Sequence, residues 1–145
     1  MAEGGDKGEQ SSAAGNKKWT KGVFQHGHAQ IPKLLIRNAA KLGIKPAQQI
    51  VLIHLLERWW FADQPPVVKK ETLARQIGIQ ARQVQRHIKT LRELGLIETS
   101  FPRRVGFNAH QYTFNGLVEK LTKIAKEDRR KLKWEKYELD DEVEF

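Results

Sequence analysis

The chain has 145 residues, of which 39% are hydrophobic, enough for one folded domain with additional terminal segments. It contains no cysteine, which excludes disulfides and cysteine-ligated metals, and its formal net charge is +9. The first 16 residues have a net charge of −2 and the last ten have a net charge of −4, so the net charge of residues 17–135 is +15. So basic a body predicts a polyanionic partner. Nucleic acid is favoured over an anionic membrane, because the cations do not flank an exposed apolar face.

Residues 1–18 are predicted to be a disordered tail, because this small, polar, glycine-rich segment buries too little apolar surface to offset its ordering entropy. Trp19, Val23 and Phe24 follow in a transitional stretch that is compatible with a short strand or arm. No apolar run approaches the length of a membrane span, and the first residues lack the apolar core of a signal peptide. A cytoplasmic, nucleoid-associated protein without membrane contact is therefore expected. Three lysines around Trp19 are candidates for phosphate contacts: Lys17, Lys18 and Lys21.

Two helices are predicted before residue 65. The first covers residues 31–42, with Pro32 in its first turn and Gly43 at its end. The second opens at Pro46 and runs to about Phe61. It is apolar on most sides, so it is expected to be the central core helix. Its apolar residues are Ile50, Val51, Ile53, Leu55, Leu56, Trp59 and Trp60.

The stretch from Lys70 to Ile97 predicts a short helix, a tight turn and a longer helix. Gly78 stands where the first helix must end in a left-handed conformation, which glycine tolerates best. Leu73 and Ile77 are four residues apart and are expected to pack on the second helix. That helix, starting at Ala81, has apolar residues at steps of four, three and three, one face of a 3.6-residue period. They are Val84, Ile88, Leu91 and Leu94.

The opposite face of this second helix is basic and rich in amides. Arg82, Arg86 and Lys89 lie together there, with Gln83 and Gln85 on the flanks. Residues 82–92 include no acid, whereas a plain solvated face usually mixes signs. Arginine pairs with guanine edges and glutamine with adenine edges, so these side chains are candidates for reading DNA. The alternative is a plain basic surface helix. Lys69 and Lys70, just before the first helix, complete this set of candidate DNA-binding residues.

A β-hairpin is predicted next, with strands at residues 97–101 and 110–114 joined by a turn at residues 102–108. Arg103 and Arg104 at its tip would contact phosphates or enter a minor groove. The alternative for the tip is a solvated loop.

The last predicted helix covers residues 116–135, with Asn115 as its cap. Its apolar side chains Leu117, Leu121 and Ile124 either form a homodimer interface or pack back on the core. Residues 136–145 are acidic. They are compatible with a solvated tail, a contact for another protein, or a mimic that competes for the DNA-binding face.

The segment LARQIGIQARQVQRHIKTLRELGLI, residues 73–97, resembles bacterial and phage winged helix-turn-helix domains, and Leu91, Gly95, Leu96 and Ile97 match the family's entry into the wing. The segments IPKLL and QQIVLIHLLERW resemble the N-terminal part of phage and plasmid replication-protein DNA-binding domains. This resemblance covers residues 19–115, with the tails and last helix outside it. It implies a mainly α fold with a small β-wing, here followed by a C-terminal helix and preceded by a disordered tail.

These patterns predict sequence-specific binding of double-stranded DNA, with the helix from Ala81 in a major groove, by a transcriptional regulator. A plasmid or phage replication initiation or partition protein is the alternative, and a winged-helix protein-interaction module is a third. The chain lacks a phosphate-binding glycine loop, a nucleophile elbow and a thiol nucleophile, so no enzyme is expected. The scattered histidines and carboxylates predict neither a metal site nor a cofactor.

Overall fold

The computed structural model describes residues 13–100 and 109–139. The chain divides into two compact units, Met1–Gln30 and Ile31–Phe145, referred to below as unit 1 and unit 2. The domain scheme expected from the sequence instead begins the DNA-binding domain at Trp19. Residues 19–30, which that scheme joins to the helix-turn-helix, thus fall in unit 1.

Unit 1 is helical where it is described. Residues 13–19 form one helix and α2 (Lys21–Phe24) a second, so of the two possibilities left open for this stretch, a short strand or an arm, the strand does not form at residues 19–24. Thr20 joins the two helices at a φ of 68°, and its hydroxyl accepts a hydrogen bond from the Val23 N–H at 3.4 Å. Residues 1–12 of the predicted disordered tail lie outside the described residues.

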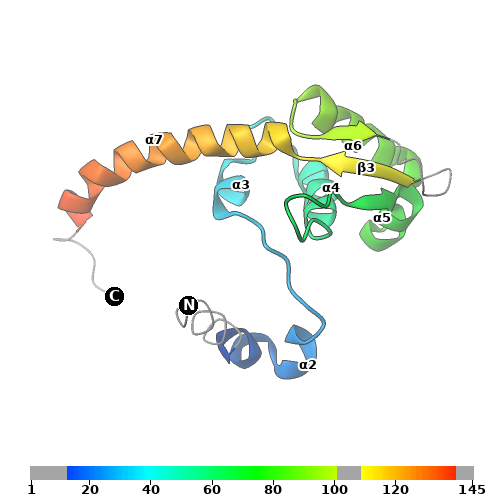
Figure 1. Ribbon diagram of the computed structural model, residues 1–145, viewed down its shortest axis with the longest axis horizontal. Coiled ribbons are helices and arrows are strands. Elements are labelled where there is room, and N and C mark those ends of the chain that lie inside the picture. Colours follow the sequence, from blue (N-terminus) through cyan, green and yellow to red (C-terminus); the bar gives the residue numbers. More distant parts are fainter. Residues whose placement is uncertain (1–12, 101–108, 140–145) are drawn as a thin grey trace. The chain divides into compact units, whose positions relative to one another are not determined.

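Unit 2 contains five helices and three strands in its described part (Figure 1). The sheet is antiparallel, in the order β1-β3-β2. The helices are α3 (Lys33–Asn38), α4 (Pro46–Leu56), α5 (Lys70–Ile77), α6 (Ala81–Glu93) and α7 (Asn115–Leu139), and the strands are β1 (Val67–Lys69), β2 (Glu98–Ser100) and β3 (Ala109–Thr113).

The hydrophobic core lies between α4, α5, α6 and the sheet. Val51, Leu52 and Leu55 of α4 are fully buried. As predicted, α6 presents one apolar face to them, while Leu73 of α5 and Tyr112 of β3 close the core from other sides. The α6 side chains on this face are Val84, Ile88 and Leu91.

The central helix is shorter than predicted, because α4 ends at Leu56 and not near Phe61. The amides of Arg58 and Trp59 bond to carbonyls three residues back, at 3.2 and 3.0 Å, so the last turn tightens. This turn places the Trp59 ring against Phe114, with centroids 5.0 Å apart. Trp60 and Phe61, predicted to belong to this helix, are instead 79% and 60% exposed.

Strand β1 is absent from the sequence-based prediction. Only Val68 of its three residues is buried, and its partner is distant in sequence, since Val67 pairs with Gln111 and Lys69 with Ala109. Three residues carry too little alternation to stand out from a loop. With β2 and β3 paired as predicted, the helices and small sheet confirm the winged helix-turn-helix fold.

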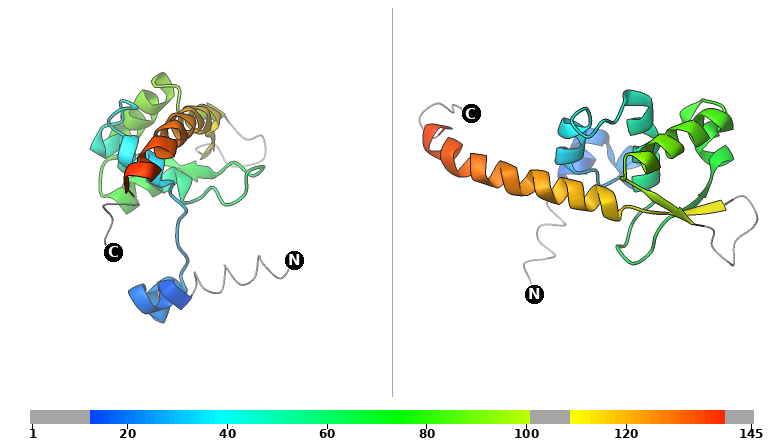
Figure 2. Two further views of the ribbon diagram at one scale, coloured as in Figure 1. Left: turned by 90° about the vertical axis from the view of Figure 1, so that its left-hand side faces the viewer. Right: turned by 90° about the horizontal axis from the view of Figure 1, so that it is seen from above.

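Helix α7 begins at the predicted cap residue Asn115 and continues to Leu139 (Figure 2). Leu117 and Ile124 are buried within the chain, and Leu121 is partly buried against the core. These side chains therefore pack back on their own unit, where α7 lies against α3. A homodimer through α7 would have to use other side chains. In the described part of the chain, no helix is both long and apolar enough to cross a membrane.

Candidate nucleic-acid interface

The turn between α5 and α6 has the predicted geometry. Gly78 ends α5 with a φ of 84°, and its N–H donates to the Ala74 carbonyl at 2.8 Å. The Ile79 N–H donates to the same carbonyl at 3.1 Å. Both bonds satisfy the carbonyl of Ala74, so α5 ends at Gly78 and α6 can begin at Ala81.

Gln83 supplies a cap at the N-terminus of α6, where Gln80 stands at the N-cap instead of the usual serine or threonine. The Gln83 side-chain oxygen accepts the Gln80 backbone N–H at 3.0 Å, the reciprocal half of a capping box. Gln83 thus has a structural role, and because one lone pair of its amide oxygen is used within the chain, its side chain has less freedom to reach a base edge. The α4 helix uses the same device, where Gln48 accepts from the Lys45 N–H at 3.0 Å.

The predicted reading face of α6 is open to solvent. All five candidate side chains on this helix are exposed, whereas the opposite face is buried in the core. Two arginines and a lysine therefore stand together with no acid between residues 82 and 92. The five are Arg82, Gln83, Gln85, Arg86 and Lys89.

A surface hollow of about 370 Å³ brings α5 and α6 together. Lys70, the first residue of α5, lines it with Gln85, Lys89 and Arg92 of α6. These three α6 residues follow at steps of four and three, so they form one stripe of the helix. The sequence interpretation missed Arg92, although this spacing from Gln85 and Lys89 was a signal that could have identified it. The other lining residues are Ile88 and Glu93.

The pKa of His110, on β3, is lowered in part by the cations beside this hollow. Its pKa lies below the ordinary value of 6.5, first because burial disfavours the imidazolium and then because Lys70 and Arg92 repel it. Glu71 acts in the opposite direction but is the weakest of these influences. The start of α5, the end of α6 and the start of β3 therefore share one electropositive region. We call Lys70, Lys89 and Arg92 the basic groove; His110 lies beside it, and its lowered pKa keeps its ring uncharged at neutral pH.

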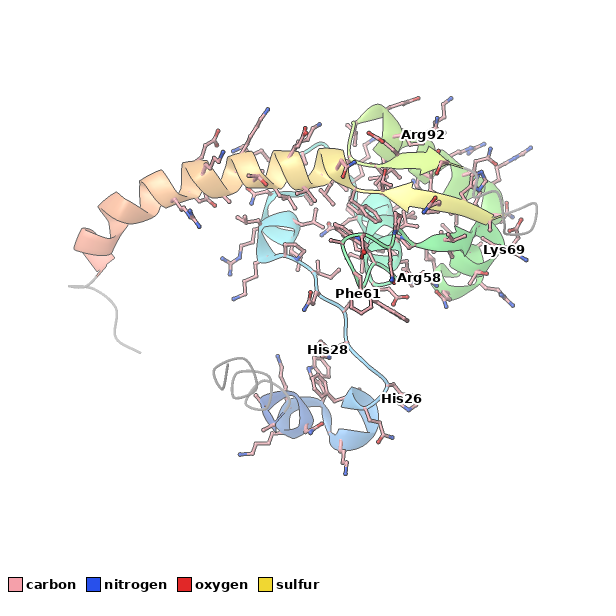
Figure 3. The ribbon with its side chains drawn as sticks, viewed as in Figure 1. His26, His28, Arg58, Phe61, Lys69 and Arg92 are labelled. Carbon is pink, nitrogen blue, oxygen red and sulfur yellow. The ribbon has the colours of Figure 1, made fainter. Side chains whose placement is uncertain are left out.

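Lys69 stands at the edge of this region. It is exposed at the end of β1 and pairs with Ala109, the first residue of β3 (Figure 3). Ala109 directly follows the predicted wing tip, residues 102–108. The candidates Arg103 and Arg104 belong to that tip and lie outside the described residues.

Arg58, just after α4, is a cation with a different role. Its guanidinium donates to the His54 carbonyl at 2.6 Å, pairs with Glu57 at 3.0 Å, and bonds to the Gln76 side chain of α5. These bonds connect α4 to α5 and leave this arginine little freedom to reach DNA (Figure 3). Within the described ranges, no three histidine or carboxylate side chains gather as they would around a metal ion.

Comparison with known proteins identifies part of unit 2. Residues 42–97, from before α4 to the residue before β2, match the helix-turn-helix domain family. No curated protein matches the chain. The match covers the turn at Gly78 and the exposed face of α6, so the helix-turn-helix recognised from the sequence is confirmed. A helix-turn-helix domain indicates DNA binding.

Proposed function

We propose that this helix-turn-helix chain binds double-stranded DNA in a sequence-specific way and acts as a transcriptional regulator. The observation that carries the proposal is the exposed face of α6, where arginine and glutamine side chains stand together without an acid. The 13 residues of α6 give a rod about 20 Å long, which fits a major groove.

The side chains divide into two groups by position. Arg82 and Arg86, in the first turns of α6, are assigned to base edges, because their forked donors match guanine. The basic groove and Lys69 are assigned to phosphates, since these cations come from β1, α5 and α6 and would fix the register of α6 on the duplex. The predicted wing arginines would extend this second group.

Regulation would follow from occupancy, because a protein bound at a promoter blocks or recruits polymerase. The alternative role in plasmid or phage replication is favoured by a separate observation, the resemblance of residues 31–35 and 48–59 to replication-protein domains. Those residues lie at the start of α3 and along α4. Both roles require the same DNA interface and differ in the sites that it occupies.

Selection of bound sites from random and genomic DNA tests the proposal. We expect enrichment of one motif, and binding whose log affinity falls by about 0.9 per log unit of salt for each phosphate contacted. A motif near promoters supports the regulator, and repeated motifs at an origin support replication. The matched control is the Arg82→Ala, Arg86→Ala double variant, which should lose the motif. Weak binding without any enriched motif would instead favour the protein-interaction module.

A further inference from the structure

Unit 1 carries a second group of cations that the helix-turn-helix does not use. Residues 13–30 contain three lysines, two histidines and no acid. The lysines are exposed on the helix of residues 13–19 and on α2. The acidic residues of unit 1 all precede residue 10, outside the described part. The three cations are Lys17, Lys18 and Lys21.

A single aromatic ring holds the described part of unit 1 together. Phe24 covers Gly15 so closely that a Cβ on Gly15 would lie 2.4 Å from the ring. The His28 ring stacks on Phe24, with centroids 4.8 Å apart and planes within 7° (Figure 3). The two short helices are thereby folded onto one another, and the lysines keep fixed positions relative to Trp19.

Trp19 is the largest side chain of unit 1, yet it is 55% exposed. The Lys18 ammonium lies 5.4 Å from the centre of its ring. Among residues 13–30, Val23 is the only other large hydrophobic side chain that is exposed. Two such side chains are far too few for the apolar centre of a protein interface. An exposed indole with one lysine ammonium beside it and two further lysines close in sequence instead suits a nucleic-acid backbone, whose phosphates bind ammonium groups and whose sugars offer surface for an aromatic ring.

We infer that unit 1 is a second DNA contact that does not read sequence, in which Lys17, Lys18 and Lys21 hold phosphates and Trp19 packs on a nucleotide. The inference rests on the proposed function of unit 2, because both units would bind one DNA molecule. A contact in the same chain acts at a high effective concentration, so even a weak one raises the affinity of the whole protein.

The test uses the full chain with all three lysines changed to alanine, on the selected duplex and on a scrambled one. We expect affinity to fall by the same factor on both, on the order of 10²-fold at 0.1 M salt if each of the three lysines neutralises one phosphate. The salt slope should decrease by about 0.9 for each phosphate that is no longer neutralised. Sequence preference, which belongs to α6, should stay unchanged.

Two matched variants make the result specific. Changing the same lysines to arginine keeps the charges and should keep the affinity. Changing the exposed residues Lys41, Lys123 and Lys126 of unit 2 to alanine removes equal charge elsewhere and should cost much less. If both alanine variants lost the same amount of DNA affinity, the loss would reflect net charge alone, and the inference would be overturned. If the parent binds DNA and the first alanine variant binds equally well, unit 1 is not a contact; if the parent does not bind, the proposed function itself fails.

A fluorescence measurement tests Trp19 independently of affinity. Tryptophan emission should change when the parent is saturated with DNA, because a nucleotide packed on the exposed indole replaces water around it. The Trp19→Phe variant should lose a large part of that change while the other tryptophans remain. An identical change in parent and variant would place Trp19 away from the DNA and overturn its part in the contact.

Discussion

Gly116 lies directly against the backbone of Gly95: a Cβ at residue 116 would be 1.8 Å from the Gly95 carbonyl oxygen. Two hydrogen bonds flank this approach. The Leu117 N–H donates to the Leu96 carbonyl at 3.1 Å, and the Lys120 ammonium donates to the Leu94 carbonyl at 2.5 Å. The first turn of α7 thus closes the end of α6, and only glycine at residue 116 permits this distance.

Gly116→Ala should therefore destabilise unit 2. The new methyl group meets backbone that cannot rotate away, so the free energy of unfolding should fall by about 1–3 kcal/mol or more. Denaturant unfolding measures the loss. Gly22→Ala is the control, because the nearest atom to its Cβ would be 4.0 Å away, and it should change stability by less than about 0.5 kcal/mol. Equal stability of the two variants would show that α6 and α7 do not meet in this way.

The two groups of DNA-binding side chains should respond differently to substitution. Arg86→Ala should cost roughly 1–3 kcal/mol of binding free energy on the preferred site and relax the choice of base there. Arg92→Ala, in the basic groove, should weaken preferred and scrambled DNA equally and lower the salt slope by about 0.9. Binding titrations on both duplexes measure these effects. Uniform losses in both variants would remove the base-reading role from Arg86.

His110 should make folding stability dependent on pH. Its native pKa is lowered, so between that value and the unfolded value of about 6.5 the unfolded chain binds more protons. The free energy of unfolding should therefore decrease as pH falls through 6.5 and level off below the native pKa. Denaturant midpoints of parent and His110→Gln at pH 8 and pH 5.5 check this, and the variant should lose less. His26→Gln, at an exposed residue of unit 1, should behave as the parent does. An unchanged pH dependence in His110→Gln would contradict the expectation.

Helix α7 provides a neighbouring pair that separates core packing from dimerisation. Leu117 is 2% exposed and Val118 is 46% exposed. Leu117→Ala should cost roughly 2–5 kcal/mol of unfolding free energy, whereas Val118→Ala should have little effect. Sedimentation of each folded variant should give the same mass state as the parent. If Leu117→Ala changed the mass state but not the stability, this side chain would instead belong to a subunit interface.

The helix-turn-helix was predictable because its determinants are local. The spacing of Val84, Ile88 and Leu91 specifies the buried face, and Gly78 specifies the turn, within one stretch of chain. The exposed face of α6 is then the one opposite these buried residues. Exposure does not itself identify a ligand, so the binding of DNA by these residues stays a prediction.

Other features depend on contacts between distant residues, which periodicity does not record. Trp60 is apolar and adjoins a core helix, yet a tightened turn directs Trp59 to the core and leaves Trp60 in solvent. Strand β1 exists through its pairing with β3, whose partner residues lie 40 to 44 residues later. The basic groove arises in the same way, because Lys70 approaches Arg92 only when α5 packs against α6.

The contact between the end of α6 and the first turn of α7 also sets the direction in which α7 leaves the core. The last buried side chain described on α7 is Ile124, and the helix continues to Leu139, about 22 Å further along its axis. The far end of α7 therefore extends beyond the core as a helix, in a direction set by its contact with α6, the helix assigned to the major groove. A fluorophore attached near Leu139 would turn with α6, so its polarisation on oriented DNA would report the angle at which the protein docks.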